Sequence, residues 1–243
     1  MRSMARSPGR YTPKAAKVSA RRALLVLLSS LSIGPPLWAQ PLGPLDSVAV
    51  YLVPLDDFPE NLAEALAKSL QHEMGMRIKA SLRLPPLRIS TLPGTNQLIA
   101  EDALAQRAQA SARLPEAVPT TWRVLLTTKD INARSGNFRF QFSMHSKTLN
   151  CSIVSLARLL DYVGDKPTLT QQSLVRLTKL TKRAIGEFCL GWTRSADPKD
   201  IMYAPLMSLD ELDRMGNDHE EEKDGATPRR IIPDPPPASD LRA

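Results

Sequence analysis

Residues 168–205 read TLTQQSLVRLTKLTKRAIGEFCLGWTRSADPKDIMYAP, and they form the element on which the rest of the chain is expected to pack. Apolar side chains recur in the first part at the three- and four-residue spacing of a helix with one buried face. They are Leu169, Leu174, Leu177, Leu180, Ala184, Ile185 and Phe188. The chain then passes Gly191, crosses a polar turn at 195–198 and returns to apolar residues at 201–203. This pattern predicts a buried helix, a turn and a second apolar segment.

A strand, a helix and a second strand are predicted upstream of this stretch. Asp46–Leu55 is short, rich in β-branched residues and bounded by prolines, which is typical of a buried strand. Pro59–Met74 carries its apolar residues on one face and ends at Gly75, which indicates an amphipathic helix. Met76–Leu84 alternates as a strand does. This order predicts a right-handed crossover in a largely parallel sheet.

The middle of the chain supplies the remaining elements. Asn96–Arg113 is expected to be helical, and Trp122–Thr128 to be a central strand. Phe138–Met144 alternates aromatic and polar residues, as expected of an antiparallel edge strand with one covered face. Cys151–Leu160 begins as a further strand, and Ser208–Met215 is a short helix with a capping box. The predicted fold class is therefore α/β (α+β), a mixed sheet with helices packed on it.

The first 39 residues have the features of a targeting segment. They contain seven Lys or Arg, no Asp or Glu, an apolar run at Ala23–Ile33 and a small residue, Ala39, at the end. Such a segment predicts a secretory signal peptide that is too short to span a bilayer. The protein is therefore expected to be exported, periplasmic or secreted. It would touch a membrane only if this segment stays uncleaved.

Charge and composition divide the rest of the chain into a linker, one globular domain and a tail. Removing the seven basic residues of 1–39 from the 32 in the chain leaves 25, against 25 acidic residues, so a nucleic-acid partner is not expected. Residues 40–45 are a short linker, and 46–216 have the size and apolar content of one globular domain. Residues 217–243 are acidic and proline-rich and are predicted to be a disordered tail.

In this order and spacing, the segments resemble the archaemetzincins, a family of small metzincin-like zinc peptidases. The matching pieces are VYLVPL with its helix, VLLTTKDI, NFRF, SIVSLARL, LVRLTKLTKRAIGEF and IMYAPLMSLDELD, between Val48 and Arg214. The resemblance implies a zincin-like fold with a cleft between the edge strand and an active-site helix. It also implies a Met-turn, with Met202 under the position of the zinc.

The same resemblance implies a degenerate active site. A zincin holds zinc with histidines one helical turn apart and activates water with a neighbouring glutamate. At the matching positions this chain has Arg183, Ala184, Glu187 and Arg194, and an alternative frame places Gly186 at the first ligand. Neither frame supplies an imidazole, so no metal and no catalytic residue is predicted. Ser195 and Asp200 occupy likely ligand positions of the family's second, cysteine-rich zinc site.

The three histidines lie in different sequence contexts. His72 and Glu73 are expected to form an exposed pair at a helix end, because the second ligand of a zincin motif would be Met76, a poor partner for zinc. His145 follows the edge strand, where it either touches a cleft ligand or lies in a surface loop. His219, in the acidic tail, is expected to be solvated.

Cys151 and Cys189 leave two alternatives open. They form one disulfide, as suits an oxidising compartment, or they remain buried thiols that pack as small apolar groups.

These observations favour an exported, non-catalytic relative of the archaemetzincins whose cleft binds a peptide or protein or has a structural role. The alternative is a zinc-dependent metallopeptidase with a non-standard ligand set such as Glu187, His145 and a cysteine. An unrelated enzyme is a third hypothesis. The sequence shows no Ser-His-Asp arrangement, phosphate-binding loop or paired catalytic carboxylates that would support it.

Overall fold

The computed structural model describes residues 47–55, 58–85, 90–135 and 137–219. The predicted signal peptide 1–39, the linker 40–45 and residues 220–243 of the predicted tail lie outside this part. Among the described helices, none combines the length and the apolar composition needed to cross a membrane.

A five-stranded mixed sheet forms the centre of the domain, with the strand order β2-β1-β4-β7-β6. The first four strands are parallel to one another, and β6 pairs antiparallel with β7 at the edge. The strands are β1 (Val50–Pro54), β2 (Ile78–Ala80), β4 (Trp122–Thr127), β6 (Ser143–Ser146) and β7 (Cys151–Ser155). The predicted crossover, central strand and antiparallel edge are thus confirmed.

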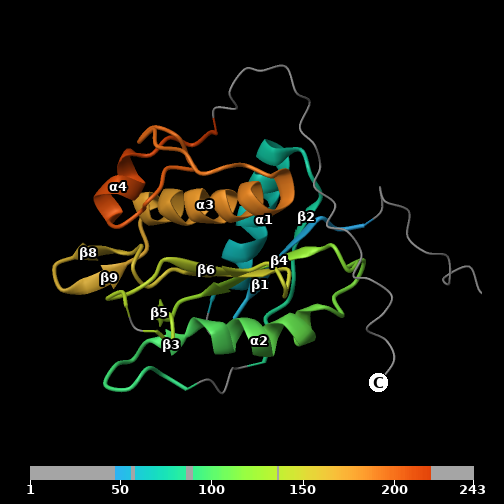
Figure 1. Cartoon of the computed structure of the whole chain (residues 1–243), viewed down its shortest axis with the longest axis horizontal. Helices are drawn as coiled ribbons and strands as arrows, with labels where there is room; N and C mark the ends of the chain where they lie inside the picture. The colour runs from blue at the N-terminus through green and yellow to red at the C-terminus, as the bar shows by residue number, and fades with distance from the viewer. Residues whose placement is uncertain (1–46, 56–57, 86–89, 136, 220–243) are drawn as a thin grey trace, which may run out of the picture. The chain divides into compact units, whose positions relative to one another are not determined.

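Helices cover both faces of this sheet (Figure 1). On one face lie α1 (Glu60–Met74) and α3 (Gln171–Ile185), with the short α4 (Leu209–Arg214) beside α3, and their apolar residues share a core that includes Leu70, Leu180 and Met202. On the other face α2 (Ala100–Ser111) packs with two short strands, β3 (Leu98–Ile99) and β5 (Ile131–Asn132). The sheet therefore separates two apolar clusters.

The edge strand begins later than the sequence predicts, because side-chain amides engage the carbonyls of the preceding segment. The Asn132 side chain donates to the carbonyl of Phe138, and the Gln97 side chain donates to the carbonyl of Arg139. Gln141 forms a bridge with Ile131 of β5. Residues 138–142 consequently run beside β5, and β6 starts only at residue 143.

The long central helix has well-defined ends. Thr170 caps α3 in a capping box with Ser173, and after Ile185 the chain continues as a π-helical turn, η2 (Gly186–Leu190). A side chain at Gly186 would collide with the Trp192 ring, since a Cβ there would lie 1.9 Å from its Cε3. Gly191, with φ 76°, then ends the helix in the left-handed conformation that favours glycine. The predicted helix is confirmed, with its last turn widened.

The hairpin that precedes α3 is not predicted by the sequence pattern. β8 (Asp161–Val163) and β9 (Lys166–Thr168) form a hairpin immediately before α3. The Gly164-Asp165 pair between them is a recognisable turn signal that the apolar pattern alone does not capture.

Candidate functional site

Four cationic side chains of α3 are buried beneath the segment that follows the helix. Arg176, Lys179, Lys182 and Arg183 are each between 6% and 7% exposed. Charged side chains are rarely buried unless they are paired. The partners of each side chain therefore show which segment of the fold it holds in place.

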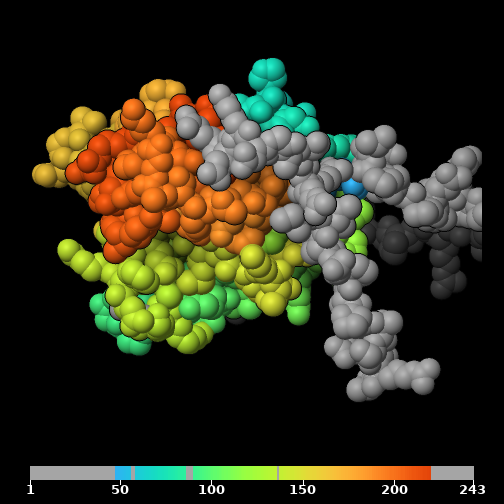
Figure 2. Space-filling view, turned by 45° about the horizontal axis from the view of Figure 1, so that its top comes forward, coloured from blue at the N-terminus to red at the C-terminus, as the bar shows by residue number. Residues whose placement is uncertain are grey.

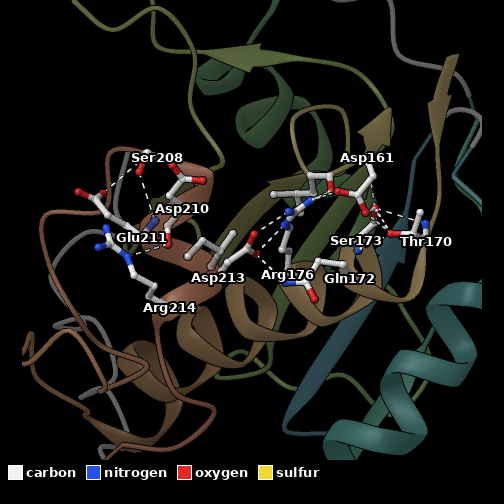
Figure 3. A network of polar contacts seen from close by, with 12 residues as sticks. Asp161, Thr170, Gln172, Ser173, Arg176, Ser208, Asp210, Glu211, Asp213 and Arg214 are labelled. Carbon is white, nitrogen blue, oxygen red and sulfur yellow. Dashed lines mark hydrogen bonds and ion pairs between the residues drawn. The ribbon is translucent and has the colours of Figure 1, made fainter. Parts of the chain in front are cut away.

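Arg176 joins α3 to two other elements. Its guanidinium makes two hydrogen bonds to the Asp213 carboxylate of α4, at 2.7 and 2.6 Å, and a third to Asp161 of β8 at 2.7 Å. Figure 3 shows it between these two carboxylates, with Thr170 and Ser173 also directed at Asp161. The hydrogen bond from Arg176 lowers the pKa of Asp213. This arrangement fixes α4 and the hairpin to the first half of the helix.

Lys179 and Lys182 hold the end of α4 and the residues that follow it. The ammonium of Lys179 donates to the carbonyls of Leu212 and Met215 at 3.1 and 2.6 Å, and to that of Asp213 at 3.3 Å. Lys182 pairs with Asp218 at 2.9 Å. Burial lowers the pKa of Lys179. These contacts order the chain as far as Asp218.

Arg183 supports the segment predicted to be the Met-turn. Its Nη1 donates to the carbonyls of Ile201, at 3.3 Å, and of Tyr203. Met202, between them, is completely buried, and its N–H donates to Asp200 at 2.7 Å. Burial, aided by the nearby Arg194 charge, lowers the pKa of Arg183 to about 10. Arg183 remains a cation at neutral pH.

The other three positions matched to the family's active site differ from one another. Glu187 of η2 pairs with Arg194 at 2.7 Å, and this pair lies beside Arg183, since both charges act on the Arg183 guanidinium. Ala184 is completely buried in the helix. Three of the four positions thus form one charged cluster, and the fourth belongs to the interior.

A pocket with a volume of about 430 Å³ opens beside this cluster. It lies between residues 138–145, α3 and residues 205–207, where the resemblance places a cleft. Figure 2 shows the orange surface of the α3 region bordering the yellow-green surface of the edge segment. The pocket is lined by Phe138, Arg139, Phe140, Gln141, Phe142, Ser143, His145, Leu180, Arg183, Arg194, Pro205, Leu206 and Met207.

His145 lies in β6 and faces this pocket. Its Nδ1 is 2.8 Å from Oγ of Ser152, which also accepts a hydrogen bond from the Trp122 indole, and its Nε2 is 3.2 Å from Oγ of Ser143. Burial, together with the charges of Arg194 and Arg183, lowers the pKa of His145 to about 3. The imidazole is therefore neutral at neutral pH. The surface-loop alternative is wrong, because a strand and two serines hold this histidine.

The aromatic residues after α3 leave the pocket open. Phe188 stacks on Trp122 with a centroid distance of 4.5 Å, and it also contacts the His145 ring. Trp192 packs on Gly186 and on the ring of His219. Neither Phe188 nor Trp192 is among the described residues that line the pocket.

His219 differs from its prediction. Its side chain is 9% exposed, and its Nδ1 lies 2.9 Å from the Asp200 carboxylate, below the Met202 segment. The expectation of a solvated residue is wrong for a structural reason: a buried carboxylate beside an aromatic ring gives the imidazole both a polar and an apolar partner. His72 is exposed at the end of α1, as predicted.

Cys151 and Cys189 are not joined by a disulfide. Cys151 belongs to the cluster on the α2 side of the sheet, whereas Cys189 packs against the cluster on the α3 side. Burial raises the pKa of the Cys151 thiol to about 12. The sheet itself separates the two sulfur atoms.

The residues of this site do not fit the zinc ion that the resemblance implies. Catalytic zinc takes three protein ligands from His, Cys, Asp or Glu. Arg183 and Arg194 carry charge of the same sign as zinc, and Glu187 is engaged by Arg194. In the described ranges, no three or more His, Cys, Asp or Glu side chains are grouped to hold a metal ion.

Comparison with known proteins identifies the fold. No protein-family model and no curated protein matches this chain. Among solved structures, a zinc-dependent peptidase from Methanocorpusculum labreanum has a TM-score of 0.56 at 21% identity, covering 70% of this chain and 95% of that one. An archaemetzincin from Methanopyrus kandleri has a TM-score of 0.53 at 20% identity, covering 73% and 92%. An archaemetzincin from Archaeoglobus fulgidus, in complex with malonate, has a TM-score of 0.52 at 21% identity, covering 70% of this chain and 94% of that one.

At such identities the likeness concerns the fold. The chain has a mixed α/β fold of the zincin-like type that archaemetzincins have, as the order of its segments predicts.

Proposed function

We propose that this chain is an exported, non-catalytic archaemetzincin-like domain whose pocket binds a peptide. The observation that carries the proposal is the cluster of Arg183, Glu187 and Arg194 beside an open pocket, at positions where the resemblance implies metal ligands. Two guanidinium groups repel a divalent cation, while a pocket of this size remains available to a ligand. The zinc-dependent peptidases of similar fold support a cleft that is suited to peptides.

The cluster also accounts for the stability of the site without a metal. Arg183 bonds the two carbonyls that flank Met202, so it ties α3 to the following segment, and Arg194 pairs with Glu187 across the last turn. These contacts hold the segment that follows α3 in place without a metal ion.

The alternative, a zinc peptidase with an unusual ligand set, needs Glu187, His145 and a cysteine on one ion. Two serines hold His145, and Cys151 packs in the cluster on the other side of the sheet. These contacts favour the non-catalytic proposal over that ligand set.

The test measures zinc and peptidase activity on the same sample. The purified full chain is dialysed against trace zinc and analysed for bound metal, and its cleavage of a mixture of unstructured peptides is followed by mass spectrometry. We expect far less than one zinc per chain, no cleavage and an unchanged melting temperature in chelator. One zinc per chain that is lost on substituting Glu187→Gln, together with cleavage, would refute the proposal.

A matched control keeps the metal measurement interpretable. The combined variant Arg183→His, Ala184→Glu, Glu187→His and Arg194→His restores the family's residue types at the four positions. Zinc uptake by a folded variant, and none by the natural chain, would assign the difference to these residues.

Export is tested separately, by fractionating bacterial cells that express the full chain with a C-terminal tag. We expect a product in the periplasm or the medium whose mass corresponds to cleavage after Ala39. A full-length product in the cytosol would contradict the export part of the proposal.

A further inference from the structure

We propose that Arg183 and Arg194 form a carboxylate-binding site inside the pocket, and that the group they receive is a carboxylate of a peptide ligand. This inference rests on the proposed peptide-binding function and specifies its chemistry.

The charge of the pocket points to an anionic ligand. Its described lining includes three arginines, Arg139, Arg183 and Arg194, and no aspartate or glutamate. Two acidic residues lie outside the lining: Glu187 pairs with Arg194, and the charges of both Glu187 and Asp200 act on Arg183. His145 adds no charge, because it is neutral at neutral pH. The balance of the pocket is therefore positive even when Glu187 and Asp200 are included.

Arg183 has donors left for a ligand. Its Nη1 makes both of its hydrogen bonds, to Ile201 and Tyr203, and no partner among the described residues bonds Nη2 or Nε. The side chain is 6% exposed and is one of the residues that line the pocket. A guanidinium has five N–H donors in a planar fork that matches a carboxylate. Burial strengthens such charge-assisted bonds, because less water competes for the donors.

Arg194 supplies a second guanidinium with more freedom. Its side chain is 49% exposed, and one contact, to Glu187, holds it. Because it lines the same pocket as Arg183, a carboxylate between the two would meet donors from both sides. A carboxylate ligand would also compete with Glu187 for Arg194, which makes Glu187 an internal competitor of the site.

An apolar rim indicates what accompanies the carboxylate. Phe138 and Met207 are 48% and 57% exposed and line the pocket, as do Phe140 and Leu206. Exposed apolar side chains around a polar centre are typical of binding sites. The preferred ligand is therefore a peptide that presents an apolar side chain next to a carboxylate.

The test uses three peptides and isothermal titration calorimetry on the full chain. They are N-acetyl-Gly-Gly-Phe with a free carboxylate, its C-terminal amide, and N-acetyl-Gly-Glu-Phe amide. We expect the free acid to bind about tenfold or more tightly than the neutral amide, since a charge-assisted pair is lost with the carboxylate. Binding of the glutamate peptide as tightly as the free acid would also support the site and would identify a side-chain carboxylate as its natural source.

Two substitutions at one ion pair should act in opposite directions. Arg194→Gln should weaken binding of the free acid by about tenfold or more, because one guanidinium is lost and Glu187 is released. Glu187→Gln should strengthen binding, because the internal competitor is removed. Arg214→Gln, at an exposed arginine that is not among the pocket-lining residues, is the matched control and should leave the affinity unchanged. If the Arg194–Glu187 pair had only a structural role, both Arg194→Gln and Glu187→Gln would weaken binding.

The outcomes separate this inference from the proposed function. Equal binding of all three peptides would overturn the carboxylate site and leave peptide binding intact. No binding of any peptide would overturn the carboxylate site, while zinc content and cleavage would still decide whether the domain is catalytic. Stronger displacement of the free acid by inorganic phosphate than by acetate at equal concentration would also overturn it, in favour of a phosphorylated ligand.

Discussion

Arg176 and Arg183 lie two turns apart on α3 and are both buried, yet their partners differ in charge. Arg176 bonds two carboxylates, Asp161 and Asp213, as well as the carbonyl of Leu159, and the hydrogen bond to Asp213 is the largest cause of its raised pKa. Arg183 bonds two main-chain carbonyls and faces another arginine, Arg194, and burial lowers its pKa. The charge of Arg176 is thus neutralised within the fold, while Arg183 presents its charge to a pocket.

This difference suggests that Arg176 mainly stabilises the fold, whereas Arg183 mainly serves the proposed binding site. A paired buried cation stabilises the fold when its geometry is good, and removing one partner leaves an uncompensated charge. A buried cation with carbonyl partners costs desolvation energy that its contacts only partly offset. Substitutions along α3 should therefore lower stability most near Arg176 and impair binding most near Arg183.

The largest effect is expected for Arg176→Met. It removes the ion pairs that connect α3 to α4 and β8 and leaves Asp161 and Asp213 without their partner. Because these carboxylates are about one-third exposed, we expect a loss of about 2–3 kcal/mol of unfolding free energy, below the range for fully buried pairs. Urea denaturation measures it. Arg214→Met, at an exposed arginine, should change stability by less than about 0.5 kcal/mol.

A pH experiment tests whether burial and the charges of Arg194 and Arg183 keep His145 uncharged. His145 faces Arg183 and Arg194, and its folded pKa of about 3 lies below its ordinary value of 6.5. The folded state then binds fewer protons than the unfolded state, so stability falls as the pH drops from 6.5 towards 3. Between pH 7 and pH 5 the natural chain should lose up to about 2 kcal/mol more than His145→Gln does. If the unfolding free energies of the two proteins fell equally with pH, His145 would not be held neutral in the folded state.

The sequence predicted the fold well because apolar periodicity and turn residues act locally. Leu177, Leu180 and Ile185 indicate the buried face of α3, and Thr170 and Gly191 mark where the helical segment starts and ends. The predicted edge strand begins too early because the Asn132 side chain, six residues away, bonds the carbonyl of residue 138 and the Gln97 side chain, 42 residues away, bonds that of residue 139. Such side-chain competition for backbone partners depends on tertiary structure and leaves no periodic signal.

The site was predicted less completely. The resemblance drew attention to Arg183, Glu187 and Arg194, which the structure places in one cluster. The role of Arg176 and Lys179 was missed, although they lie seven and four residues before Arg183, which puts all three on one helix face. On an isolated helix that face would be solvated, and it is buried by the packing of residues 201–218 and of the segment at Leu159 and Asp161.

A smaller loss of stability is expected for Lys179→Met. Lys179 donates to three carbonyls at the end of α4, and these bonds are removed while the length of the side chain is kept. Since burial lowers the pKa of Lys179, part of this loss is offset by relief from burying a charge. We expect a decrease of about 1 kcal/mol in urea denaturation. Lys166→Met, at an exposed lysine in the hairpin, is the control and should have no measurable effect.

The smallest effect on stability and the largest on binding should coincide at Arg183→Met. The substitution removes two hydrogen bonds to carbonyls and also a buried cation beside Arg194, and these changes oppose each other. We expect less than about 1 kcal/mol of lost stability, below the loss at Arg176→Met, because no carboxylate is left unpaired. Binding of N-acetyl-Gly-Gly-Phe by the same sample should nevertheless become undetectable, since the guanidinium with free donors is gone. Denaturation should therefore show the larger loss of stability for Arg176→Met, and calorimetry the larger loss of binding for Arg183→Met. Equal losses of stability in the two variants would mean that Arg183, like Arg176, serves only to hold the fold together.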